Sequence, residues 1–178
     1  MIPYVAFLRG INVGGHGLVK MADLKKAFVD MGFRNVRTLL ASGNVLFESA
    51  AADPQAVAGK IVSGLKKSLN KDIGVAVRSR HHLERIRDAD PFGGIALTPS
   101  IRLYVTFLGP GPVLGRLTLP YSSPQGDFRM LRATPTEVFS VLDLARGKGT
   151  PELMSAIEKE FGADVTTRSW NTLLKALA

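Results

Sequence analysis

The order of apolar segments along the first eighty residues is the feature that most restricts the fold. Two segments, which begin at Met21 and after Asp53, place apolar residues every three or four positions, as amphipathic helices do. Four short apolar runs have the length and composition of β-strands: 4–8, 36–40, 45–47 and 75–77. The order strand, helix, strand, strand, helix, strand predicts a ferredoxin-like arrangement, with an antiparallel sheet covered by helices.

Local signals support the ends of these elements. Asp53 and Pro54 together are typical of a helix start, because the carboxylate accepts hydrogen bonds from free backbone N–H groups and proline already has a helical φ. Gly32 is a natural end for the helix that begins at Met21. Gly43 and Asn44 both tolerate a positive φ, so they predict a tight hairpin between the two middle strands.

The second half has a similar order of elements, and the prediction of a repeat rests on that order rather than on matching residues. Three apolar runs predict strands: 102–108, 128–132 and 138–144. A helical turn is expected at 113–119, and Thr150 with Pro151 opens a longer helix. Thr166 and Thr167 are expected to cap a last helix. We therefore predict an α+β protein of two ferredoxin-like (βαββαβ-type) subdomains, with antiparallel sheets covered by helices.

The expected division of the chain follows from this pattern. Residues 1–80 form the first ferredoxin-like subdomain, residues 81–100 a helical linker, and residues 101–178 a second α+β subdomain with a C-terminal helix.

Composition excludes some classes of protein and leaves the partner open. The chain has 178 residues, of which 46% are hydrophobic and 21% charged, as in ordinary globular proteins. Cysteine is absent, which excludes thiolate nucleophiles, zinc fingers and iron–sulfur clusters. The net charge of +8 permits an anionic partner, which could be nucleic acid, a phosphate-bearing ligand or a membrane surface. A solvated basic surface that keeps the protein soluble explains the charge more simply than a binding role does. No apolar stretch approaches the ~20 residues that span a bilayer, and no leader pattern is visible, so a cytoplasmic location without membrane association is expected.

The connection from residue 9 to residue 20 is the most informative segment for function. It contains four glycines, the cations Arg9 and Lys20, and no carboxylate. Glycines such as Gly14 and Gly15 let backbone N–H groups approach an anion, and the following helix N-terminus adds positive potential. A structural interpretation is equally supported, in which the segment is a tight crossover and Asn12 bonds the backbone.

Residues of the closing segment also invite two interpretations. Trp170 is more typical of a core anchor on a capped helix than of a ring that stacks on a ligand. Arg168 and Asn171 are planar polar groups beside it, and they suit the recognition of an anion.

Residues that could carry catalysis are few. His16 is the one group of the glycine-rich connection with a suitable unperturbed pKa for acid–base work. His81 and His82 are neighbours, so they point apart and do not chelate one metal ion. No cofactor and no metal ion is expected, and no catalytic residue can be assigned.

The chain resembles a widespread bacterial family that is catalogued only as a domain of unknown function. Its N-terminal motif is Arg-Gly-Ile-Asn-Val-Gly-Gly and its C-terminal motif is Thr-Thr-Arg-x-Trp-Asn-Thr. The segments that carry the likeness are 4–15, 20–21, 42–45 and 166–172. The resemblance implies two ferredoxin-like subdomains and no established activity. Ser169 departs from the Asn that the family usually has there, so no role at position 169 is implied.

Three functional hypotheses remain. The leading one is a binding module for a small anionic, phosphate-bearing ligand in a polar, cationic cleft, whose expected residues are Arg9, Asn12, Gly14, Gly15, Lys20, Ser42, Asn44, Arg168, Trp170 and Asn171. The second is nucleic-acid binding, less favoured because the sheet is expected to be covered rather than open and aromatic. The third is an enzyme that uses His16 as acid or base. The sequence does not indicate an oligomeric state.

Overall fold

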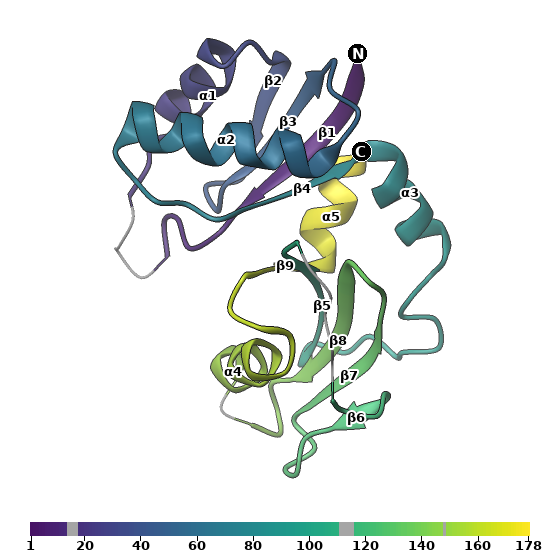
Figure 1. Cartoon of the computed structure of the whole chain (residues 1–178). Helices are drawn as coiled ribbons and strands as arrows, with labels where there is room; N and C mark the ends of the chain where they lie inside the picture. The colour runs from purple at the N-terminus through teal and green to yellow at the C-terminus, as the bar shows by residue number, and fades with distance from the viewer. Residues whose placement is uncertain (14–17, 111–115, 148) are drawn as a thin grey trace. The chain divides into compact units, whose positions relative to one another are not determined.

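The chain is an α+β protein with one antiparallel sheet in each half (Figure 1). The computed structural model describes residues 1–13, 18–110, 116–147 and 149–178. The first sheet and the elements around it are β1 (Ile2–Leu8), α1 (Met21–Asp30), β2 (Arg34–Leu39), β3 (Asn44–Ser49), α2 (Pro54–Leu69), β4 (Val75–Ser79) and α3 (Arg80–Asp88). The second sheet and its helices are β5 (Ile101–Leu108), β6 (Tyr121–Ser122), β7 (Phe128–Ala133), β8 (Glu137–Asp143), α4 (Thr150–Phe161), β9 (Val165–Ser169) and α5 (Trp170–Leu177). The predicted fold class is confirmed.

The chain divides into two compact units. The first unit contains Met1–Arg85 together with Ala176–Ala178, and the second contains Ile86–Lys175. The boundaries therefore fall within α3 and α5. No helix in the described part of the chain combines the length and the apolar character needed to cross a membrane.

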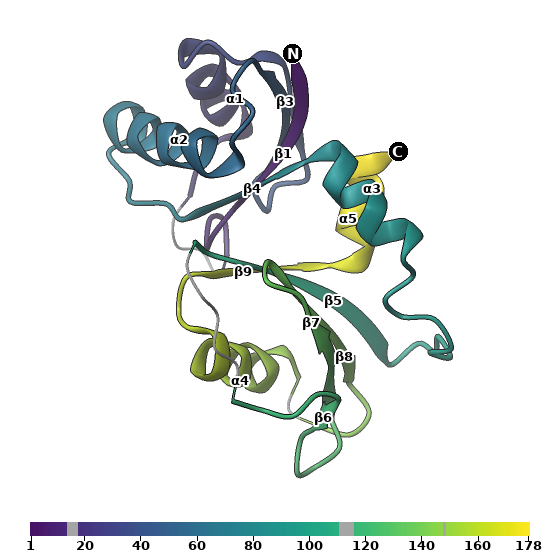
Figure 2. The same ribbon diagram turned by 45° about the vertical axis from the view of Figure 1, so that its right-hand side comes forward.

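The first unit has the strand order β2-β3-β1-β4, with antiparallel neighbours throughout. Helices α1 and α2 lie on the same face of this sheet (Figures 1 and 2). Side chains alternate along a strand, so Tyr4, Ala6 and Leu8 of β1 enter the core beneath these helices. Val5 and Phe7 point to the opposite face and are buried as well. Strand β1 is thus central and covered on both sides, as its continuous apolar run predicts.

The second unit repeats this order with one addition, β6-β7-β8-β5-β9. Helix α4 packs its Leu153 and Ile157 against one face of the sheet, where they meet Val138 and Leu142. The helical turn expected at 113–119 falls partly outside the described residues, and the described part of that segment forms no helix.

Strand β9 is the main error of the sequence prediction. Thr166 and Thr167 do not cap a helix but pair with β5, where the Thr167 hydroxyl lies 2.8 Å from that of Thr106. Consecutive β-branched residues favour the extended chain, which explains the strand. Helix α5 begins only at Trp170, and its backbone is capped by Ser169, whose Oγ accepts a hydrogen bond from the N–H of Thr172 at 3.3 Å.

Three further helix and turn signals have mixed outcomes. The Asp53 carboxylate accepts hydrogen bonds from the second and third residues after it, so the predicted cap is confirmed. Helix α4 starts one residue earlier than expected, because Gly149 is its N-cap and Thr150 is already helical. In the turn before β3, the positive φ angles belong to Leu40 and Gly43, while Asn44 is already in the strand.

Strand register shows that the two units correspond residue by residue, and a short sequence match accompanies this correspondence. Tyr4-Val5-Ala6-Phe7-Leu8 of β1 matches Tyr104-Val105-Thr106-Phe107-Leu108 of β5. Val5 lies opposite Leu46 and Arg78, while Val105 lies opposite Phe139 and Arg168. The central strands therefore have equivalent neighbours on both sides.

The last strands of the units match in the same way. In each, an arginine donates from Nη1 to the carbonyl of the residue before it: Arg78 to Val77 at 3.0 Å and Arg168 to Thr167 at 2.9 Å. The serine that follows, Ser79 in the first unit, accepts from the backbone N–H of the third residue after it in both units. The two units are therefore structural repeats, and a position in one can be compared with its equivalent in the other.

Candidate functional site

The glycine-rich connection leaves β1 at Arg9, whose backbone N–H donates to the carbonyl of Gly74 at 2.8 Å. Asn12 lies in the left-handed region with φ +55°. Its Nδ2 donates to the carbonyls of Val19 at 3.0 Å and Ala41 at 2.7 Å, and its Oδ1 accepts from the N–H of Val19 at 2.8 Å. Asn12 thus braces the crossover, as the structural interpretation of this segment predicts.

The turn between β2 and β3 is braced in a similar way. The buried Asn44 donates from Nδ2 to the carbonyl of Leu39 at 2.9 Å and to Oγ of Ser42 at 3.1 Å. Because Asn12 also bonds Ala41, the structure brings the crossover and this turn together in the first unit. The amides of Asn12 and Asn44 contribute to this local architecture.

The remaining predicted residues of the first unit are placed in part. Lys20 is exposed and is the N-cap of α1, without a side-chain capping bond. Gly14, Gly15 and His16 lie outside the described residues, so their roles remain predictions.

The predicted residues near the C-terminus belong to the second unit. Burial lowers the pKa of the Arg168 guanidinium to about 10. Trp170 packs edge-on against Phe92, with ring centroids 5.1 Å apart, as expected for a core anchor. Asn171 is exposed on α5. The gathering of these residues with Arg9 and Asn12 around one ligand remains a prediction.

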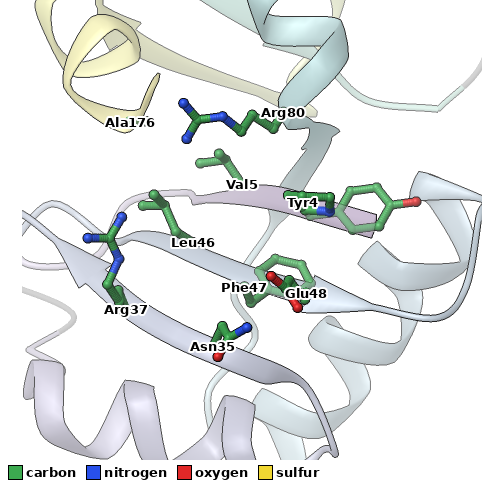
Figure 3. A pocket seen from close by; sticks show the side chains of 10 residues that line it. Tyr4, Val5, Asn35, Arg37, Leu46, Phe47, Glu48, Arg80 and Ala176 are labelled. Atoms are coloured by element: carbon green, nitrogen blue, oxygen red, sulfur yellow. The ribbon is translucent and has the colours of Figure 1, made fainter. Parts of the chain in front are cut away.

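A hollow of about 250 Å³ in the first unit was not anticipated from the sequence (Figure 3). We call it the first-unit hollow, and its main side chains are Val5, Asn35, Arg37, Leu46, Glu48 and Arg80. All of them belong to the first unit. The hollow therefore lies against the first sheet, with charged groups around an apolar floor.

Strand register explains the position of each side chain. Val5 of β1 lies opposite Leu46 of β3, which lies opposite Arg37 of β2. Directly opposed residues share a face of the sheet, so these three form a row across it. The rings of Tyr4 and Phe47 belong to the core on the helix side, away from this row (Figure 3).

Arg80 and Arg37 contribute positive charge in different ways. Arg80 is the first residue of α3, where its Nε donates to Glu84 at 2.9 Å and its Nη2 donates to the carbonyl of Leu177. Its guanidinium is therefore held in place. The guanidinium of Arg37 is exposed and makes no ion pair or hydrogen bond with the described residues, and the same holds for the half-buried carboxylate of Glu48.

The sequence contains one signal for this site, the positions of two charged residues in and after apolar runs. Arg37 interrupts the apolar run 36–40, and Glu48 follows the run 45–47. Side chains alternate between the two faces of a strand, so charged residues that alternate with apolar ones indicate the face opposite the helices.

Residues 1–119 match the model of a protein family described as "Protein of unknown function (DUF1697)". The chain belongs to this family. The match includes β1 to β5 and the whole glycine-rich connection, whereas the C-terminal motif at 166–172 lies beyond it.

The DUF1697 chain is also similar to a solved structure, that of the conserved bacterial protein SP0830 from Streptococcus pneumoniae. The two share 20% sequence identity and a TM-score of 0.65, and the likeness covers 98% of this chain and 96% of the other. This supports the fold. No curated protein matches the sequence.

Two further observations concern side chains that could hold a metal ion or stack on a base. Among the described residues, no group of three or more His, Asp or Glu side chains could hold a metal ion. None of the large hydrophobic side chains that the described residues expose is aromatic. RNA-recognition modules of ferredoxin-like topology instead stack bases on exposed sheet aromatics.

Proposed function

We propose that the chain is a binding module for a small anionic ligand, such as one with a phosphate group, and that the first-unit hollow is its site. The observation that carries the proposal is the position of Arg37, whose guanidinium pairs with no described residue and lies at the rim of a hollow whose lining also includes Arg80. Two guanidinium groups around one space are suited to charge-assisted, bidentate hydrogen bonds with phosphate or carboxylate oxygens.

Pre-organisation supports the same assignment. Arg80 is already fixed by Glu84 and by the carbonyl of Leu177, so a ligand need not order that side chain on binding. The apolar floor of Val5 and Leu46 lowers the local dielectric, which strengthens electrostatic attraction above it.

The size of the hollow limits the ligand. A volume of about 250 Å³ lies slightly below the usual range of ligand pockets, so it suits a compact molecule and not a nucleic-acid strand. The net charge of +8 adds a long-range attraction for anions.

The glycine-rich connection keeps a secondary place in the proposal. Asn12 and Asn44 use their amides on backbone groups, which favours the hollow over the connection as the anion site. Arg9 and Lys20 remain predicted contributors to the positive potential of the first unit.

The test is a thermal-shift and calorimetric titration with inorganic pyrophosphate and simple phosphate monoesters. We expect at least one of them to raise the Tm of the wild-type protein, and Arg37→Ala to lose most of that shift. Lys25→Ala is the matched control, because it removes one exposed positive charge from α1 without touching the hollow. The proposal is wrong if no anion stabilises the wild type, or if Arg37→Ala responds as fully as Lys25→Ala.

A further inference from the structure

The place in the second unit that is equivalent to the first-unit hollow is filled by aromatic rings. Register sets the equivalence. Tyr104 and Val105 match Tyr4 and Val5, so Phe139, opposite Val105, takes the place of Leu46. By the same reasoning, Arg132, opposite Phe139, takes the place of Arg37, opposite Leu46. Trp170, which follows Ser169, takes the place of Arg80, which follows Ser79.

The rings of the second unit form a continuous cluster. The guanidinium carbon of Arg132 lies 5.4 Å from the centroid of the Phe139 ring. Phe92 meets Phe139 edge-on at 5.9 Å and Trp170 edge-on at 5.1 Å. Phe139 is 1% exposed, so this place is closed. The arginine on strand β7 therefore has an aromatic ring as its partner.

The first unit keeps the arginine, but its described residues place no ring at the equivalent position. Leu46 and Arg80 stand where the second unit has Phe139 and Trp170, and a hollow results. Arg37 has no partner among the described residues. The repeat thus shows which group suits this place, and none of the described residues of the first unit supplies that group.

We propose that the ligand supplies the missing ring, so that the site selects a compact aromatic anion, a flat ring that carries a phosphate or carboxylate group. This inference rests on the proposed function of the hollow. The ring lies on Leu46 with Arg37 over its face, and the anionic group lies against Arg80.

The charges around the hollow suit such a molecule better than a simple anion. An aromatic ring has a negative face and a positive edge. Its face attracts the Arg37 guanidinium, and its edge is compatible with the Glu48 carboxylate, which would repel an anion without a ring. Glu48 is therefore explained by an aromatic ligand and unfavourable for a bare phosphate.

The first experiment compares phenyl phosphate with cyclohexyl phosphate by calorimetric titration of the full-length protein. The two probes share their charge and approximate size and differ in the π-system. We expect phenyl phosphate to bind at least about threefold more tightly, in line with one cation–π contact. Equal affinities would overturn the aromatic inference and leave the anion proposal intact. Failure of both probes to bind would contradict both.

The second experiment rebuilds the second unit's arrangement in the first. Leu46→Phe introduces a phenyl ring at the position equivalent to Phe139 and so fills the hollow. We therefore expect the affinity for phenyl phosphate to fall at least tenfold while the Tm stays unchanged. Val62→Phe is the control, since it adds a ring at an exposed position of α2. Unchanged binding by Leu46→Phe would overturn the inference.

A third variant covers the case in which Leu46→Phe fails to fold. Arg37→Lys keeps the charge but loses the planar group that stacks on a ring. We expect it to bind cyclohexyl phosphate within about twofold of the wild type and to lose the preference for phenyl phosphate. A preference that survives in Arg37→Lys contradicts the stacking role.

Discussion

The Nδ2 of Asn12 lies 2.7 Å from the carbonyl oxygen of Ala41, so one side chain joins the crossover after β1 to the turn between β2 and β3. The same amide donates from Nδ2 to the carbonyl of Val19 and accepts at Oδ1 from the N–H of Val19. Asn12 also has φ +55°, a conformation that asparagine tolerates better than most residues. Asn12 thus connects residue 19 and the β2–β3 turn to the start of the crossover.

Asn12→Ala is expected to destabilise the protein by about 2–4 kcal/mol. The left-handed conformation costs alanine roughly 1 kcal/mol, and the lost hydrogen bonds add about 1–3 kcal/mol. Urea denaturation followed by circular dichroism measures the change. Asn35→Ala is the matched control, because Asn35 has φ +50° but its amide makes no hydrogen bond with the described residues. Equal losses in the two variants would show that the Asn12 bonds contribute nothing.

Gly43→Ala tests the close packing of the turn between β2 and β3. Gly43 has φ +79°, and a Cβ there would lie 2.5 Å from Cδ1 of Ile11 and 3.0 Å from Cβ of Leu8. We expect a loss of about 2–4 kcal/mol, the sum of conformational strain and overpacking. Gly10→Ala has φ +64° and open space around its Cβ, so it should lose only about 1–2 kcal/mol. The urea midpoints of the two variants measure both losses in stability. A smaller loss of stability for Gly43→Ala than for Gly10→Ala would contradict the packing argument.

Asp143 predicts a specific dependence of stability on pH. Hydrogen bonds from Ser100 and from the backbone N–H of Ala145, together with the nearby Arg146, hold the pKa of this carboxyl below its usual range. A lowered pKa means that the folded state binds fewer protons than the unfolded state. The stabilisation is therefore complete at neutral pH and is lost as the pH falls below about 4.

Asp143→Asn should accordingly be less stable than the wild type at pH 7, and the difference should shrink as the pH falls below about 4. Urea denaturation at several pH values measures the difference. Asp30→Asn is the comparison, since its carboxylate pairs with Lys26 on an exposed helix face, where an ion pair contributes little. A difference between Asp143→Asn and the wild type that does not change with pH would refute the assignment.

Local patterns predicted most of the fold because they reflect local physics. The helical spacing after Met21 and the Asp53-Pro54 cap both yielded the elements found. Strand β9 was missed because Thr166 and Thr167 suit a helix cap as well as a strand, and only pairing with β5 decides between them. That pairing is a long-range contact, which a local pattern does not contain.

The candidate site was less predictable for the same reason. The sequence drew attention to glycines and amides, and Asn12 turned out to serve the backbone. Arg37 and Arg80 are 43 positions apart, and they line one hollow only because β1 and β3 lie between them. The equivalence of Leu46 and Phe139 likewise depends on strand register. The two residues differ in size and belong to no shared sequence motif, so only their pairing with Val5 and Val105 relates them.

Phe139→Leu converts the filled place of the second unit into the arrangement of the first. The ring of Phe139 contacts Phe92 and carries Arg132 over its face, so its removal leaves a cavity and an unpartnered guanidinium. We expect a loss of about 1–3 kcal/mol in stability. Trp170, the single tryptophan of the chain, packs on Phe92 and reports unfolding by fluorescence. A double-mutant cycle with Arg132→Ala should give a coupling of about 0.5–1 kcal/mol, and additive losses would show that Arg132 and Phe139 act independently.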